Sequence, residues 1–433
     1  MSHLGLICPE LSGHLNPMTT LGRELQRRGH RVTLVGRLDA RRKAQSAGLN
    51  FVAISEADYP EGAMQETSRQ LGRLSGLKAV QFTAELLRKN VAAVLRDAPA
   101  VVDGEKIDAL LVDQVSPAGG TVADLTNRPW VMVSNALALN PDPHLPPCVL
   151  PWDYDTGLLG RWRNAFGDAV LKWIARPIIG EINRHRRERR LAPMTSTFSS
   201  GSCRLQVAQQ PAFFDFPRSV PAKLLHYTGP WHHAGSHEEI PFPWEKLDGR
   251  PLIYASMGTL QNRQRFIFET IAAACAGLDA QLVISLGSRD QDAESAAKSF
   301  AGQPIVVPIA PQLALLQKAT LTITHAGLNT ALESLSCGVP MVAIPITNDQ
   351  PGVASRLAWL GAAEVVQPSK LTVPRLRAAV ERVLRESGFR DAAQRCRGEI
   401  QQADGLQRAA DIVEKAFAEV APATQAGGRL SPA

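Results

Sequence analysis

The sequence predicts an α/β fold in which two doubly wound parallel sheets, each a separate domain, face one another across a cleft. Short apolar strands alternate with amphipathic helices in residues 1–220, and the same alternation resumes in residues 249–405. Between them, residues 221–248 are rich in Pro, His and Trp and lack periodicity, which is typical of an interdomain linker. The chain has 433 residues, enough for two domains that each bury a core.

Composition excludes several classes of protein. With 45% hydrophobic and 20% charged residues the chain is globular rather than disordered. A net charge of +6 is spread along the whole length, so we expect no nucleic-acid partner. No apolar run approaches the roughly 18 residues of a membrane span. The six cysteines are scattered without a C-x-x-C pair, which favours a reducing cytoplasm over a disulfide framework or a zinc site.

The first residues form a strand, loop, helix and strand unit. A strand is predicted over Leu4–Cys8 and a helix over Met18–Arg28, with Asn16 as its cap and Pro17 at its first position. His14 is therefore expected in the loop that leaves the carboxyl end of the first strand. Open α/β sheets bind their ligands at this edge.

The rest of residues 1–220 continues the alternation. A buried strand ends at Asp113, a helix covers Ala118–Leu125, and another strand covers Trp130–Val133. These elements predict one doubly wound domain.

Residues 157–190 have apolar side chains at helical spacing and a basic end. Two interpretations stay open for this helix. It packs its apolar side on the domain and leaves the charged end in water, or it rests on an anionic membrane surface.

The second half of the chain predicts a second parallel domain. Strands are expected at 251–255, 281–285, 305–308, 321–324 and 341–345, and helices at 264–276, 313–318 and from Asn329 onward. A final helix over 406–420 is expected to pack back on the N-terminal domain. Residues 421–433, rich in Pro, Gly and Ala, are expected to be disordered.

Several cofactor motifs are missing from the sequence. There is no G-x-G-x-x-G and no Gly-Lys pair, which excludes dinucleotide-binding and P-loop signatures. Two D-x-D triplets, at 153–155 and 290–292, do not close a predicted strand. We therefore expect no metal and no cofactor.

The run from His325 to Glu333 predicts an anion site. His325 ends a strand and Gly327 begins a helix, so unpaired backbone N–H groups and the positive end of the helix dipole meet there. Asn329 and Thr330 can add side-chain donors, and Glu333, one turn on, can accept from ribose hydroxyls.

Two further segments complete this candidate site. Ser256, Gly258 and Thr259 form a loop of small residues after a strand, which can close on the same phosphates. Asp349 and Gln350 follow another strand, and a carboxylate beside an amide is suited to sugar hydroxyls.

The run from Ala310 to Gln350 resembles the nucleotide-sugar signature of the inverting UDP-glycosyltransferases, which include plant secondary-metabolite, macrolide and bacterial carotenoid glycosyltransferases. The resemblance extends to residues 13–17, Asp113, the 256–259 loop and residues 227–230. It implies the GT-B fold, with His14 as general base and Asp113 as its orienting partner. The donor-binding residues that it implies are Ser256, Gly258, Thr259, Ala310, Gln312, His325, Gly327, Leu328, Asn329, Thr330, Glu333, Asp349 and Gln350.

The resemblance implies metal-independent transfer of a hexose, glucose above all, from a UDP-sugar to a hydroxyl of a lipophilic acceptor. Such an acceptor is a terpenoid, carotenoid, sterol, flavonoid or macrolide, and the product is a β-glycoside. The UDP-sugar is a substrate, not a cofactor. Where the plant signature has Trp the chain has Ile309, and inside the His-Gly-Asn run it has Ala326 and Leu328. Ile309 leaves a TDP-deoxysugar donor open. A nucleotide-sugar epimerase or binding protein of the same fold is the alternative from another class.

Overall fold

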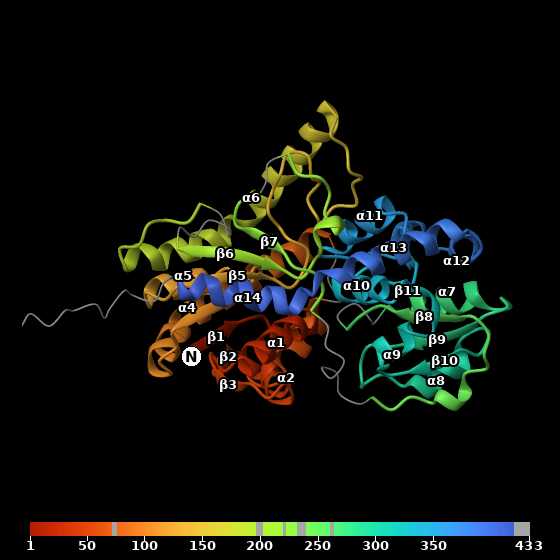
Figure 1. Ribbon diagram of the computed structural model, residues 1–433, viewed down its shortest axis with the longest axis horizontal. Helices are drawn as coiled ribbons and strands as arrows, with labels where there is room; N and C mark the ends of the chain where they lie inside the picture. Colours follow the sequence, from red (N-terminus) through yellow and green to blue (C-terminus); the bar gives the residue numbers. More distant parts are fainter. Residues whose placement is uncertain (72–75, 196–201, 220–221, 232–239, 260–263, 420–433) are drawn as a thin grey trace, which may run out of the picture.

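Two parallel sheets confirm the predicted fold class in this computed structural model, which describes residues 1–71, 76–195, 202–219, 222–231, 240–259 and 264–419 (Figure 1). The first sheet has seven strands in the order β3-β2-β1-β4-β5-β6-β7. Its strands are β1 (His3–Ile7), β2 (Arg31–Gly36), β3 (Asn50–Ala53), β4 (Ala109–Asp113), β5 (Trp130–Ser134), β6 (Cys203–Ala208) and β7 (Leu225–Tyr227).

The second sheet has six strands in the order β10-β9-β8-β11-β12-β13, again with parallel pairs. Its strands are β8 (Leu252–Ser256), β9 (Gln281–Ser285), β10 (Ile305–Val307), β11 (Ala319–Thr324), β12 (Met341–Ala343) and β13 (Ala363–Val365). The strands β8 and β12 are wholly buried, and β9 and β11 are buried over their last four residues, as expected where helices cover both faces of a parallel sheet.

Each sheet reverses its winding direction once. The chain runs outward from β1 to β3 and then returns to β4 on the other side of β1; likewise it runs from β8 to β10 and returns to β11 beside β8. The loops that follow β1 and β4 diverge, as do those that follow β8 and β11. In folds of this kind such divergence opens a crevice at the carboxyl edge of each sheet. Asp113 and Ser256 are the last residues of β4 and β8, while His14 and His325 follow β1 and β11.

Helices cover the sheets on both sides. The first domain has α1 (Ser12–Arg27), α2 (Arg41–Ser46), α3 (Ala63–Leu71), α4 (Gly76–Gly104), α5 (Gly119–Leu125) and α6 (Leu158–Glu188). The second has α7 (Arg265–Cys275), α8 (Ala293–Ser299), α9 (Gln312–Leu316), α10 (Leu328–Ser336), α11 (Gln350–Trp359), α12 (Val373–Arg385) and α13 (Ser387–Ala403). The last helix, α14 (Gly405–Ala418), lies on the first domain, with Leu406 and Val413 in the same core as Leu21 and Leu25.

The first helix begins earlier than the sequence predicts. α1 starts at Ser12, so Asn16 is no cap, Pro17 lies inside the helix, and His14 sits in the first turn instead of a loop. The helix tolerates Pro17 near its start because only one intrahelical hydrogen bond, to the carbonyl of Gly13, is lost.

The segment predicted as a linker, 221–248, contains a strand. β7 pairs with β6 through Leu225, His226 and Tyr227, so the first sheet extends into this range. Three residues are too few to show periodicity in the sequence. Residues 232–239 of the predicted linker and the predicted tail 421–433 lie outside the described residues.

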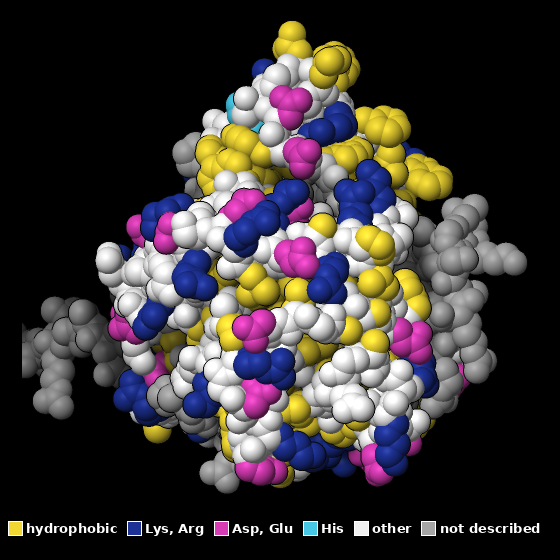
Figure 2. Space-filling model, turned by 90° about the vertical axis from the view of Figure 1, so that its right-hand side faces the viewer, with side chains coloured by type: hydrophobic (Ala, Val, Ile, Leu, Met, Phe, Trp, Pro, Cys, Tyr) yellow, Lys and Arg dark blue, Asp and Glu magenta, His cyan; other side chains and the backbone are white. Residues whose placement is uncertain are grey.

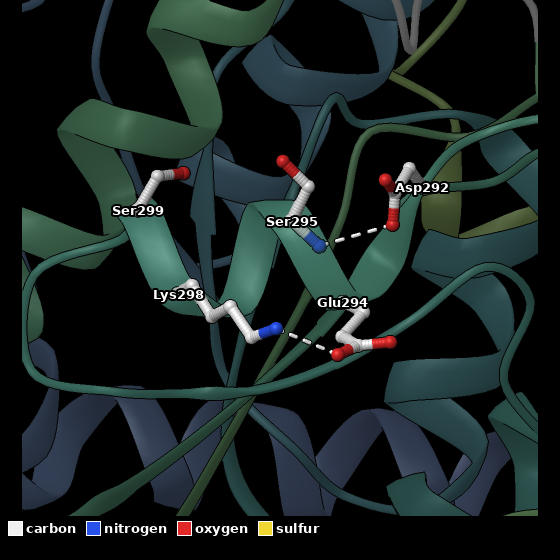
Figure 3. Close-up of a pocket in the computed structure, with 5 residues that line it drawn as sticks. All are labelled: Asp292, Glu294, Ser295, Lys298 and Ser299. Atoms are coloured by element: carbon white, nitrogen blue, oxygen red, sulfur yellow. Dashed lines mark hydrogen bonds and ion pairs between the residues drawn. The ribbon is translucent and has the colours of Figure 1, made fainter.

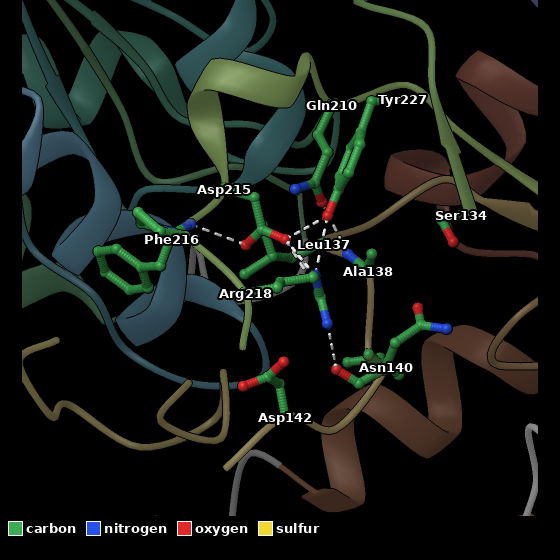
Figure 4. Close-up of polar contacts among 12 residues, drawn as sticks. Ser134, Leu137, Ala138, Asn140, Asp142, Gln210, Asp215, Phe216, Arg218 and Tyr227 are labelled. Carbon is green, nitrogen blue, oxygen red and sulfur yellow. Dashed lines mark hydrogen bonds and ion pairs between the residues drawn. The ribbon is translucent and has the colours of Figure 1, made fainter. Parts of the chain in front are cut away.

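A buried carboxylate joins the two domains. Asp215, after β6, accepts hydrogen bonds from Nε and Nη2 of Arg356 on α11, at 3.1 and 2.7 Å. It also accepts from Nε of Arg218 at 2.9 Å (Figure 4). The hydroxyl of Tyr227 donates to the same carboxylate. Burial opposes ionisation of Asp215, but the charges of Arg356 and Arg218 outweigh it and lower its pKa.

The Arg356 side chain is almost wholly enclosed. It is 2% exposed, and its guanidinium lies 4.3 Å from the centre of the Phe216 ring. A fully paired buried charge of this kind is costly to leave without its partner.

We expect Asp215→Ala to lower the free energy of unfolding by about 3–5 kcal/mol, because the substitution leaves Arg356 buried and uncompensated. Urea denaturation followed by circular dichroism measures this. The exposed pair Lys298–Glu294 provides the control, and Lys298→Gln should cost only about 0.3–0.5 kcal/mol. Equal small losses for both variants would show that the buried pair does not hold the domains.

Candidate active site

His14 and Asp113 are in direct contact. Nδ1 of His14 lies 2.9 Å from Oδ2 of Asp113, and the carboxylate also accepts from Nδ2 of Asn135 at 2.6 Å and from the backbone N–H of Val115 at 2.8 Å. Because the carboxylate accepts, Nδ1 carries the proton and Nε2 keeps its lone pair. The imidazole is thus oriented as a base.

The surroundings of His14 favour its protonated form. Burial lowers the pKa of the imidazole, but the charge and hydrogen bond of Asp113 outweigh it, and Asp349 adds to the effect, so the pKa is raised overall. The imidazole keeps 15% of its side-chain surface exposed, whereas Asp113 has none. A ligand can therefore reach the imidazole and not the carboxylate behind it.

His325 lies between two glycines of the second domain. A Cβ atom at Gly258 would lie 2.6 Å from the imidazole, and one at Gly327 would lie 2.5 Å from Nε2, so neither position accepts a side chain without movement. Gly258 also has a φ of +72°, which glycine adopts without strain. Burial lowers the pKa of His325 to about 4, so its imidazole is neutral near pH 7.

The start of α10 is the predicted anion site. No side chain caps this helix, and its first turn contains no acidic residue. Ala326, just before it, has a φ of 62°, a left-handed conformation that non-glycine residues seldom adopt. The turn therefore presents its N–H groups and the positive end of the helix dipole at the crevice.

Glu333, Gln312 and Thr330 form one buried network. Nε2 of Gln312 lies 2.5 Å from Oε2 of Glu333 and 3.3 Å from Oγ1 of Thr330. The hydroxyl of Tyr254 donates to Oε1 of Gln312 at 3.1 Å and holds the amide in place. Burial raises the pKa of Glu333 to about 7, although the hydrogen bond from Gln312 opposes the shift.

Asn329 connects the two domains in this structure. Its Nδ2 donates to the carbonyl of Gly13 at 2.9 Å, and its Oδ1 accepts from Nε2 of Gln209 at 2.7 Å. The Gly13 carbonyl is available because Pro17, four residues later, has no N–H to donate to it. The backbone N–H of Asn329 and the second N–H of its amide are left for an anion, and the role of the amide in phosphate binding stays a prediction.

Asp349 and Gln350 stand at the start of α11. Oδ2 of Asp349 accepts the N–H of Leu137 from the first domain at 3.1 Å. Oε1 of Gln350 accepts the N–H groups of Ile346 and Thr347, at 2.8 and 3.0 Å. This leaves the other carboxylate oxygen of Asp349 and the NH2 group of Gln350 for a ligand.

The remaining predicted residues divide into two kinds. Ser256 is buried behind Gly258, and Thr259 is exposed at the edge of the same loop. The side chains of Ala310 and Leu328 lie in hydrophobic cores, so only their backbone can meet a donor.

The D-x-D triplets have structural roles. Asp292 caps α8 by accepting the N–H of Ser295 at 3.0 Å, on a shallow surface where Lys298 pairs with Glu294 (Figure 3). Asp155 accepts the N–H of Gly157 at 2.8 Å. Within the ranges described, no group of three or more His, Cys, Asp or Glu side chains is placed to hold a metal.

The sequence reasoning missed residues that orient the site. Asn135 follows β5 and donates to Asp113, and Gln209 follows β6 and donates to Asn329. Both come directly after the last residue of a strand. The same strand-end rule that marked Asp113 could have found them.

Curated relatives match the chain over its whole length. A zeaxanthin glucosyltransferase from Pantoea ananas is 30% identical over 431 residues, covering 99% of both chains. One from Pseudescherichia vulneris is 29% identical over 424 residues, covering 96% of this chain and 98% of the relative.

Solved structures and a family model agree with this result. The glycosyltransferase of kitacinnamycin superposes with a TM-score of 0.76 at 22% identity, covering 96% of this chain and 98% of that one, which supports the GT-B fold. Residues 210–397 match the model of the family described as UDP-glucoronosyl and UDP-glucosyl transferase. With its full-length relative at 30% identity, the chain belongs to this family and is a glycosyltransferase.

Proposed function

We propose that the protein transfers a hexose, most readily glucose, from a UDP-sugar to a hydroxyl of a lipophilic small molecule, with inversion at the anomeric carbon. The His14–Asp113 pair carries this proposal. It stands at the crevice of the first sheet, and the charge of Asp349, next to the predicted sugar residue Gln350, reaches it. This electrostatic contact between the proposed base and a proposed donor residue supports the assignment.

In the proposed reaction Nε2 of His14 takes the proton of the acceptor hydroxyl as its oxygen attacks C1 of the sugar. The bond from C1 to the diphosphate oxygen breaks, and its electron pair leaves with UDP. Asp113 stabilises the imidazolium that forms. One in-line displacement converts an α-linked donor into a β-glycoside.

The leaving diphosphate gathers negative charge, which the N-terminus of α10 is suited to accept. The N–H groups of its first turn are fixed donors in a largely buried position, and the neutral imidazole of His325 lies beside them. We propose that they serve where other transferases use a metal ion. Glu333, held by Gln312, would accept from the ribose hydroxyls.

The acceptor is proposed from the relatives, which are named zeaxanthin glucosyltransferases. A hydroxylated carotenoid or terpenoid is the first class to test, followed by sterols, flavonoids and macrolides. A cytoplasmic location is proposed because all six cysteines are free thiols. A TDP-deoxysugar donor remains the alternative, since Ile309 offers no aromatic ring for stacking on uracil.

We expect UDP release from UDP-glucose only when a hydroxylated acceptor is added, and His14→Ala should lower this turnover roughly 10²- to 10⁴-fold. UDP is measured by a coupled assay, and the product by mass spectrometry. UDP binding should stay near normal, because His14 lies on the acceptor side.

His3→Ala is the control variant for this assay. That histidine bonds to Glu105 and Thr33 at the far end of β1 and should retain turnover. Full activity of His14→Ala, or nucleotide release that needs no acceptor, would rule out the assignment. Loss of turnover on EDTA that manganese restores would overturn the metal-free mechanism.

We expect the affinity for UDP to fall about tenfold from pH 8 to pH 6 because ribose hydroxyls donate to the ionised form of Glu333, whose pKa is about 7. Isothermal calorimetry across this range measures it. UDP itself also titrates in this range, and it does so equally for both proteins. The Glu333→Gln variant lacks the titrating carboxyl, so its affinity for UDP should vary less with pH. Identical pH profiles for both proteins would count against the role of Glu333.

Asp349→Asn should lower kcat/KM for UDP-glucose about 10- to 100-fold, because a charged acceptor for sugar hydroxyls is lost. The amide oxygen of the variant can still accept the Leu137 N–H, so the domain contact is kept. Kinetics with a panel of UDP-sugars measures the change, with Gln350→Ala as a second variant. A donor profile unchanged in both would refute the sugar assignment.

A further inference from the structure

The first half of α6 carries large apolar side chains that face water. We call them the α6 stripe: Leu158, Leu159, Trp162, Phe166, Val170 and Trp173. Leu159 is 85% exposed, Trp162 76% and Phe166 69%. The helix rises above both domains in Figure 1, and Figure 2 shows hydrophobic side chains gathered at that end of the molecule.

The stripe is one face of the helix. Trp162, Phe166 and Val170 are spaced by four residues, and Trp173 follows by three, so their side chains lie in a row. Pro177 ends this part, since it breaks the backbone hydrogen bond to the carbonyl of Trp173. Beyond Pro177 the helix is embedded, and Ile178 and Ile182 are buried in the core of the first domain.

The opposite face of the same half is fixed to the protein. A Cβ at Gly167 would lie 2.8 Å from the Trp152 ring, and one at Gly160 would lie 2.4 Å from the carbonyl of Asp155. Nδ2 of the buried Asn164 donates to the carbonyl of Pro143 at 3.3 Å. The helix therefore cannot roll to bury the stripe, and packing of the stripe on its own domain, one of the two interpretations of the sequence, is wrong for this half.

Cations border the stripe. Arg161 and Arg176 are exposed, and within the described ranges neither is paired with an acidic group. Lys172 is exposed too, and Asp168, four residues before it, is half-buried. Asp153 and Asp155 are exposed just before the helix, so residues 153–176 hold four cations against three carboxylates and carry a net charge of +1. An apolar face with such a rim is complementary to a surface whose interior is apolar and whose outer layer is anionic.

We propose that the α6 stripe inserts into the interface of an anionic lipid bilayer and holds the protein there as a peripheral enzyme. Trp and Phe side chains favour the boundary between headgroups and acyl chains, while the flanking cations attract anionic headgroups. No helix among the described residues combines the length and apolarity needed to cross a membrane, so contact would be at the surface. This inference does not depend on the sugar donor or on the chemistry of the site.

The test is cosedimentation of the full-length protein with vesicles of phosphatidylcholine alone and of equimolar phosphatidylcholine and phosphatidylglycerol. We expect binding to the second kind. The triple variant Trp162→Ser, Phe166→Ser and Trp173→Ser should reduce the partition coefficient by at least about tenfold for each ring removed. Arg161→Glu with Arg176→Glu should lose the preference for anionic vesicles, by about fivefold for each charge.

Phe266→Ser is the matched control, because that ring is 51% exposed on α7, away from the stripe. It should bind vesicles as the wild type does, and the urea midpoints of all variants should match. The proposal fails if the wild type binds neither kind of vesicle, or if the triple variant binds vesicles as tightly as the wild type does. It also fails if the wild type is a dimer that the triple variant dissociates without any vesicle binding, because a second copy would then cover the stripe.

Discussion

The ion pair between Asp215 and Arg356 is the constraint on which the site depends. The sheets fold as separate units, so their crevices could face one another at many angles. Four contacts attach α11 and its N-cap to the first domain. Arg356 pairs with Asp215, and the N–H of Gly352 donates to the carbonyl of Cys148 at 2.8 Å. The hydroxyl of Ser355 donates to the carbonyl of Trp152 at 3.2 Å, and Asp349 accepts the N–H of Leu137. Because Asp349 is the N-cap of this helix, the contacts that fix the domain angle also fix the proposed sugar-binding residues relative to His14.

A second connection between the domains lies beside the proposed phosphate site. Asn329, on the first turn of α10, reaches the carbonyl that Pro17 leaves unpaired in α1. The helix that carries the proposed base and the helix proposed to receive the diphosphate thus touch directly. Pro17, which by itself would only weaken α1, makes this contact possible. Where Gly258 and Gly327 stand, any side chain would collide with His325, so the backbone remains open to a phosphate. The proposed chemistry rests on this contact between helix starts.

The α6 stripe shows how the same pattern can have two outcomes. Apolar residues at helical spacing predict a buried face, and beyond Pro177 that expectation is correct. Before Pro177 the helix extends past the edge of the domain, and Gly160 and Gly167 bring its other face against the protein. The periodicity of the two halves is similar, but only the position of the helix relative to the sheet decides which half meets water.

The sequence by itself determined the two parallel domains and most of the site, because strand periods and strand-end residues are local signals. His14, Asp113 and the run from His325 to Glu333 were all predicted at strand ends. Only the tertiary structure decided where α1 begins, that Leu225–Tyr227 forms a strand, which partners Asn329 takes, and that Asp215 meets Arg356. These four features depend on contacts between residues far apart in the chain. The packing of the helices and strands sets such contacts, and no local sequence pattern shows them.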